Sequence, residues 1–129
     1  MAGLINLFIV GAGGFLGAIA RYLLGGAAQR VSGGTFPLGT LAVNVLGCLL
    51  IGVLMYAIEN RPLLDPRTRL FAVIGFLGAF TTFSAFGHET IALIRDGEWA
   101  LALLNAGANL FLCLGAVILG RFAAKLAGI

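Results

Sequence analysis

The chain has 129 residues, of which 60% are hydrophobic and only 10% are charged, and its mean hydropathy is +1.08. A soluble domain carries about 25% charged residues, so this chain has too few charges to cover a water-exposed surface. The formal net charge of +3 comes without any basic run, which argues against nucleic acid as a partner. These features predict a small integral membrane protein with a single transmembrane domain over residues 1–129.

Four apolar segments are long enough to cross a lipid bilayer, which takes about 20 residues in a helix. We expect transmembrane helices over residues 4–24, 38–58, 70–94 and 99–124. A Gly/Ser-rich connection joins the first two, and the linker RPLLDPRTR, which we expect to be a water-exposed loop, joins the middle two. No alternation typical of barrel strands is sustained, so the sequence predicts an all-α bundle.

Basic residues are nearly balanced between the two ends of such a bundle. The end with both termini and the central linker holds Arg61, Arg67, Arg69, Arg121 and Lys125, whereas the opposite end holds Arg30 and Arg95, with Arg21 near the boundary. The positive-inside rule therefore places the central linker in the cytoplasm by a small excess only. So weak a bias permits insertion in either orientation.

Glycines predict close approach between helices. Gly13 and Gly17 form a small-xxx-small pair in the first segment. Gly47 and Gly52 leave similar room for a neighbouring helix beside the second segment.

The two cysteines, Cys48 and Cys113, both lie inside apolar runs. Because no CxxC or Cys/His cluster accompanies them, we interpret them as small buried hydrophobes and not as a disulfide or a metal pair. The sequence also has no nucleophile–base–orienter set, so we do not expect an enzyme.

The third apolar segment contains an unusual stretch, GFLGAFTTFSAFGHET, at residues 75–90. Gly75 and Gly78 lower helix propensity, and the adjacent Thr81 and Thr82 can bond to their own backbone. Together they predict a helix break near the middle of the bilayer. Carbonyl groups freed at such a break cannot face lipid, and they suit a hard cation such as Na⁺.

Further polar side chains lie inside the apolar segments, where each needs a partner or a function. They are Thr40 and Asn44 in the second segment, Ser84, His88 and Glu89 in the third, and Asn105 and Asn109 in the fourth. Nearly all can donate hydrogen bonds, and the first, second and fourth segments have no interior carboxylate. This argues against a proton-coupled carrier or an acidic cation pore and suits an anion. The alternative is that the amides only join helices.

Phe83 and Phe86 follow the predicted break and lie three residues apart, on one face of a helix. Aromatic ring edges carry the positive end of the quadrupole, so the pair could line the path of an anion. Ordinary packing is the alternative interpretation of the same pattern.

Three motifs carry a resemblance to a known family. GFLGAFTTFSAF resembles the signature GFxGGxTTFSTF of the CrcB (Fluc) family of small fluoride channels, TLAVNVLG resembles its TxxVNxxG, and GGFLGAIARY resembles the end of its first helix. The resemblance covers essentially the whole chain. The sequence departs from the family pattern at Ala79, Ala85, His88 and Asn105.

The resemblance implies a passive fluoride channel in a bacterial-type inner membrane, built as an antiparallel, dual-topology homodimer with two pores and a broken third helix. It also implies a structural Na⁺ at the dimer centre, held by the main-chain carbonyls of Gly78 and Thr81. The implied fluoride-pore residues are Phe83, Phe86, Asn44, Ser84 and Thr82, and the vestibule or polar track would hold Arg21, Thr40, Glu89, Asn105 and Asn109.

Two other functions remain open. A small four-helix multidrug transporter has the same size, but it needs a buried acid in the first helix, where Asn6 is the only strongly polar side chain before Arg21. A non-conducting subunit of a larger membrane complex would leave Phe83 and Asn44 as packing residues.

Overall fold

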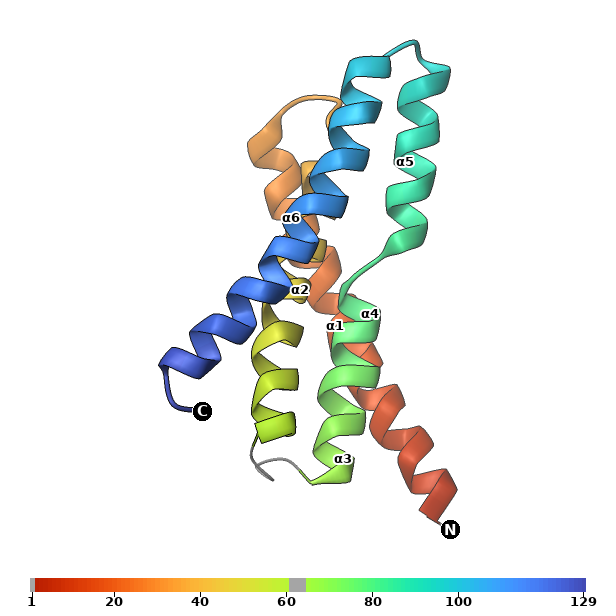
Figure 1. Ribbon diagram of the computed structural model, residues 1–129. Coiled ribbons are helices and arrows are strands. Elements are labelled where there is room, and N and C mark those ends of the chain that lie inside the picture. The colour runs from red at the N-terminus through yellow and green to blue at the C-terminus, as the bar shows by residue number, and fades with distance from the viewer. Residues whose placement is uncertain (1, 61–64) are drawn as a thin grey trace.

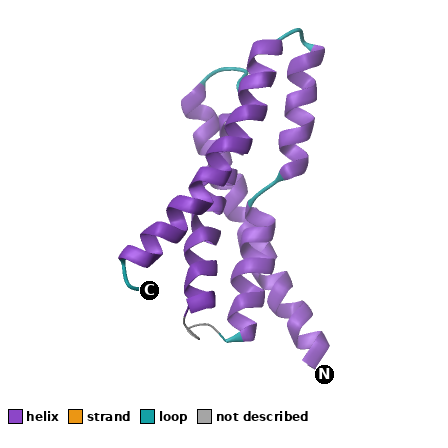
Figure 2. Ribbon diagram, in the orientation of Figure 1, coloured by secondary structure: helices purple, strands orange, loops and turns teal. Residues whose placement is uncertain are grey.

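The computed structural model describes residues 2–60 and 65–129, which form four helical spans and no strand (Figures 1 and 2). Its helices are α1 (Ala2–Ser32), α2 (Leu38–Asn60), α3 (Pro66–Arg69), the π-helical segment η1 (Leu70–Leu77), α4 (Gly78–Phe80), α5 (Phe83–Arg95) and α6 (Trp99–Leu126). The segments from α3 to α5 make up the third span. Each span is long and apolar enough to cross a membrane, which confirms the prediction of an all-α membrane protein.

The first helix is longer than the sequence predicted, since it continues past Leu24 to Ser32. Alanine, glutamine and arginine in AAQR, residues 27–30, favour a helix and extend it through the expected connection. The side chain of Gln29 then binds the chain that follows. Its Nε2 donates to Phe36 O at 3.0 Å, and its Oε1 accepts from Gly39 N at 3.0 Å.

The second half of the predicted linker is also helical, which corrects the expectation of a loop there. Asp65 is the N-cap of α3, because its side chain accepts a bond from Thr68 N at 2.6 Å. Pro66 occupies the first turn, where its missing N–H costs nothing. Residues 61–64, the first half of the linker, lie outside the described residues.

Close backbone contacts hold the spans together at glycines, as the sequence predicted. A Cβ atom on Gly13 or Gly17 would collide with the main chain of η1, at Phe71 and Phe76 respectively. On the other side of the bundle, a Cβ on Gly52 would collide with the carbonyl of Val117 in α6. Small residues therefore let α1 approach η1, and α2 approach α6, at backbone distance.

The third span is broken at Thr81 and Thr82, as predicted. Both residues are extended, with φ/ψ of −88°/157° and −149°/115°. Figure 1 shows this link as a thin segment between α4 and α5, with α5 continuing beside α6. Phe80, only 1% exposed, packs with Val43 and Leu77 directly before the break, so the interruption lies against the best-buried part of the protein.

Candidate functional site

Asn44, which lies on the neighbouring helix α2, binds the main chain at the break. Its Oδ1 accepts from Thr82 N at 2.7 Å, and its Nδ2 donates to Thr82 O at 3.1 Å. In an uninterrupted helix the amide of Thr82 would instead bind the carbonyl of Gly78. The side chain of Asn44 therefore replaces the preceding turn of helix as the partner of the Thr82 N–H, and it also binds the carbonyl of the same residue.

Thr82 begins the helix after the break. Its Oγ1 accepts from Ala85 N at 3.1 Å and lies 3.2 Å from Ser84 Oγ. In a continuous helix the amide of Ala85 would bind the carbonyl of Thr81. This N-cap is typical of threonine, and it leaves the carbonyl oxygens of Gly78 and Thr81 without their regular helical partners.

These main-chain carbonyl oxygens are of a chemical type that can bind the predicted sodium ion. Gly78 and Thr81 border one cavity of about 200 Å³ between α2 and the third span. Within residues 2–60 and 65–129, no group of three or more His, Cys, Asp or Glu side chains could hold a metal. A hard cation at this place would therefore depend on main-chain oxygens, which are ligands that such cations accept.

A chain of hydrogen bonds continues from Asn44 across α6 to α5. Asn44 Nδ2 donates to Asn109 Oδ1 at 3.1 Å, and Asn109 Nδ2 donates at 3.0 Å to both the carbonyl and Oδ1 of Asn105. Asn105, fully buried, donates to Thr90 Oγ1 at 2.9 Å, and Thr90 donates to Phe86 O at 2.7 Å. The asparagines of the second and fourth predicted segments thus join α2, α5 and α6.

The phenylalanine pair lies beside this network. Phe83 and Phe86 contact each other with ring centroids 5.3 Å apart and planes tilted by 48°. Both rings line a cavity of about 520 Å³ with Asn44, Thr82 and Asn109. Phe83 is 83% exposed, although it follows a buried break, so much of its ring is uncovered in the single chain.

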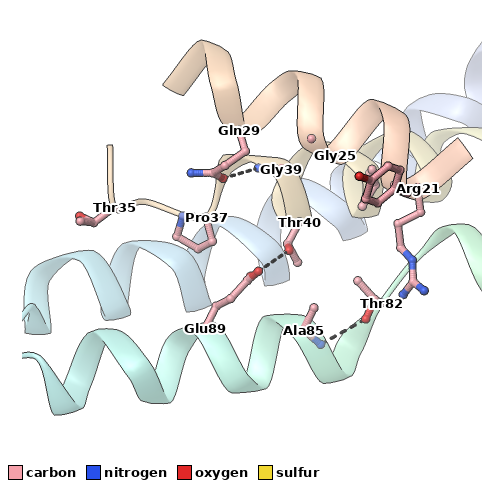
Figure 3. Close-up of a pocket in the computed structure, with 13 residues that line it drawn as sticks. Arg21, Gly25, Gln29, Thr35, Pro37, Gly39, Thr40, Thr82, Ala85 and Glu89 are labelled. Carbon is pink, nitrogen blue, oxygen red and sulfur yellow. Dashed lines mark hydrogen bonds between the residues drawn. The ribbon is translucent and has the colours of Figure 1, made fainter. Parts of the chain in front are cut away.

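A second cavity, of about 510 Å³, lies on the other side of the break (Figure 3). Arg21 lines it from α1, Thr40 from α2 and Glu89 from α5. Thr40 Oγ1 donates to Glu89 Oε1 at 2.7 Å. The other carboxyl oxygen of Glu89 is buried and has no hydrogen-bond partner among the residues that the structure describes.

Thr82 lines both cavities. The structure thus brings together most residues of the predicted pore and vestibule around Thr82. Asn105 lies deeper, sealed in the contact between α5 and α6. Ser84 is exposed and reaches the site through the hydroxyl of Thr82.

Sequence reasoning missed two residues at this site. Gln29 lines the cavity of Arg21 and fixes the turn between α1 and α2. Thr90 ends the asparagine network, one residue after Glu89. The partners of Gln29 depend on how the chain turns between α1 and α2, and the partner of Thr90 depends on how α5 meets α6.

These features define the class of the molecule. It is a multi-pass helical membrane protein whose third span is interrupted inside the bundle, with two cavities lined by residues of the interruption.

Comparison with known proteins identifies the family. Residues 8–121 match the family described as CrcB-like protein, Camphor Resistance (CrcB), and the chain belongs to this family. It is 46% identical over 115 residues to a protein of Nitratidesulfovibrio vulgaris, covering 89% of this chain and 93% of the relative. A relative from Shewanella baltica is 47% identical over 116 residues, which cover 90% of this chain and 93% of the relative. A relative from Geobacter sulfurreducens is 48% identical over 112 residues, which cover 87% of this chain and 90% of the relative. All three are named fluoride-specific ion channel FluC.

Proposed function

We propose that this protein is a fluoride-selective ion channel that exports cytoplasmic fluoride passively. Relatives that match about nine-tenths of the chain carry that name, and an ion channel agrees with the expectation that the chain is not an enzyme. The observation that carries the proposal is that Thr82, inside the broken third span, lines both cavities. This arrangement offers a polar route where an unbroken apolar helix would offer none.

The groups along this route suit a small anion that only accepts hydrogen bonds. The hydroxyls of Thr82 and Ser84 carry two hydrogens, and the bond between them uses one. The other hydrogen remains for an anion. Phe83 and Phe86 add ring edges, which are weakly electropositive, and Arg21 adds a positive charge at one cavity. Weak, serial contacts of this kind allow an ion to bind and also to leave.

In this proposal Asn44 is not primarily a fluoride ligand. Its two N–H bonds are already used, by Thr82 O and Asn109 Oδ1. Fluoride could bind this amide only by displacing one of those acceptors. Asn44 therefore acts first as a positioning residue, which sets the Thr82 hydroxyl and the start of α5.

A second copy of the chain completes the proposed channel as an antiparallel homodimer. Gly78, with its polar main chain, and Ser84, with its hydroxyl, are both exposed in the middle of a membrane span. Phe83 is 83% exposed. Lipid cannot satisfy polar backbone or hydroxyl groups, so protein must cover them. The near balance of basic residues between the two ends is consistent with insertion in both orientations.

Sodium is the proposed structural ion of this dimer, bound by the carbonyl oxygens of Gly78 and Thr81 from both copies. Those carbonyls have lost their helical partners, and they need a donor or a cation inside the bilayer. A bound cation would also lower the electrostatic cost of an anion nearby.

Fluoride efflux from liposomes that contain the purified protein tests the channel function. Valinomycin and K⁺ clamp the membrane potential, a fluoride-selective electrode follows release, and a parallel run measures chloride. We expect fast release of fluoride and almost none of chloride. No fluoride release from protein that is verified as folded would favour a non-conducting membrane subunit.

The antiparallel arrangement has its own test. Glu98→Cys places a single thiol in the exposed turn before α6, in a background with both native cysteines replaced by serine. A membrane-impermeant maleimide should label about half of the chains from each side of sealed vesicles. Labelling from one side alone would contradict dual topology without touching the proposal of fluoride conduction.

A further inference from the structure

The two cysteines face each other across the seam between α2 and α6. These helices pack side by side, and Asn44 binds Asn109 at a separation of 65 residues. Two turns later Gly52 contacts the carbonyl of Val117, and the Tyr56 ring lies 5.7 Å from the guanidinium carbon of Arg121.

The two cysteines occupy matching positions in this register. Cys48 comes four residues after Asn44, and Cys113 comes four residues after Asn109. Because residues four apart share one face of a helix, the register pairs Cys48 with Cys113. Both side chains border one cavity, as this pairing requires.

Both thiols are free and half-buried. Both line the cavity of about 520 Å³ that also contains Asn44, Phe83 and Phe86. A small ion that enters this cavity would therefore meet both sulfur atoms.

We propose that Cys48 and Cys113 form a dithiol site for a soft, thiophilic metal cation that accepts two-coordinate binding, with Hg²⁺ as the simplest example. Binding forms two metal–sulfur bonds and releases the two thiol protons to water, with no change in oxidation state. Soft cations prefer thiolate ligands. A divalent ion and two thiolates have no net charge, which suits the low dielectric of a membrane interior.

Harder or higher-coordinate metals do not fit the same place. A structural zinc site takes four protein ligands, and the described residues offer no group of three or more His, Cys, Asp or Glu side chains. The nearby amide oxygen of Asn44 is occupied by Thr82 N, and that of Asn109 by Asn44 Nδ2. Two sulfur ligands are therefore what the cavity provides.

A metal bound here would also obstruct the cavity beside Phe83 and Phe86. This second part of the inference rests on the proposed fluoride conduction, whereas metal binding does not. The sequence gives a clean background for both parts, because the chain has only these two cysteines.

Mercury retention by the purified protein tests the site. Protein reduced with a phosphine is mixed with HgCl₂, dialysed against 2-mercaptoethanol, and analysed for mercury per chain by mass spectrometry. We expect the wild type to keep one ion per chain. Cys48→Ser and Cys113→Ser should each hold at least about tenfold less, because the second thiolate acts at a high effective concentration, and the double variant should hold none. Cys48→Ala and Cys113→Ala repeat the test if a serine variant fails to elute as folded protein.

Two results would overturn the site: two ions per wild-type chain, or single variants that resist 2-mercaptoethanol as well as the wild type does. Fluoride efflux with and without HgCl₂ tests the obstruction, each variant being compared with itself. Efflux should fall on mercury binding in the wild type and stay constant in the double variant. Retained mercury with undiminished efflux would overturn the placement of the site beside the conduction route. Untreated wild-type efflux separately reports whether the protein conducts at all.

Discussion

Asn44 binds both main-chain polar groups of Thr82 with its side-chain amide, accepting from the N–H at 2.7 Å and donating to the carbonyl at 3.1 Å. One side chain on α2 thereby satisfies the backbone of a residue that has left the helix. The break in the third span is a property of this pair of residues as much as of the glycines and threonines around it. It also explains how an interrupted helix persists next to a core as tightly packed as Phe80 and Val43.

Replacing Asn44 by alanine should destabilise the protein and reduce fluoride efflux. The change leaves the buried N–H of Thr82 without its partner and removes the side-chain donor to the Thr82 carbonyl, and an unpaired buried group costs about 1–3 kcal/mol. The apparent Tm in detergent measures the first effect and liposome efflux the second. Asn60→Ala is a matched control, because Asn60 donates to Tyr56 O at an exposed helix end. Equal Tm values for the two variants would contradict the role given to Asn44.

Phe83→Ile should reduce fluoride efflux while the protein still assembles. Isoleucine keeps the apolar volume but removes the ring edge, and an aromatic interaction of about 1 kcal/mol corresponds to a roughly fivefold change in rate. Efflux and size-exclusion elution are measured on the same preparation. Phe8→Ile is the control, since Phe8 is 71% exposed near the start of α1. An efflux unchanged by Phe83→Ile would remove that ring from the pore wall.

Much of the fold could be predicted from the sequence because apolar length and local chemistry determine it. Four runs of suitable length predict the spans, and the doubled threonine of the third predicts the break. The end of α1 could not be predicted, because the bonds from Gln29 to Phe36 and Gly39 form only when the turn to α2 is in place.

The site could be predicted only as a set of side chains, and their partners could not. The sequence placed Asn44 in one predicted helix, and it placed Asn105 and Asn109, four residues apart, on one face of another. It could not say that the donors of Asn44 point to a main-chain carbonyl and a second amide, since this depends on how α2 and α6 align. The sequence offered Cys48 and Cys113 only as two small apolar residues, because their placement on one cavity follows from an interhelical register and not from sequence spacing.

Gly17→Ala should lower the stability of the protein. The added Cβ would lie within 3.1 Å of Phe76 Cα and closer still to its carbonyl group, so α1 and η1 would have to separate. Overpacking of this kind costs about 1–3 kcal/mol. At Gly11, by contrast, an added Cβ meets no other atom of the described chain within 4 Å. Gly11→Ala should therefore keep or raise the apparent Tm, because alanine favours a helix by up to about 1 kcal/mol. A fall in Tm of the same size for both variants would contradict the close contact at Gly17.

Removal of sodium should destabilise the assembled protein if the carbonyls of Gly78 and Thr81 bind it. A ligand that binds only the folded state at 100 times its Kd stabilises that state by about 2.7 kcal/mol. The apparent Tm is therefore measured in NaCl and in N-methylglucamine chloride at equal ionic strength, with KCl as a test of size selectivity. We expect the Tm to rise with sodium concentration and then level off. Because the ligands are main-chain oxygens, Thr81→Ser should keep this sodium dependence. A Tm equal in all three salts would rule out a stabilising sodium site, while leaving the fluoride assay to decide conduction.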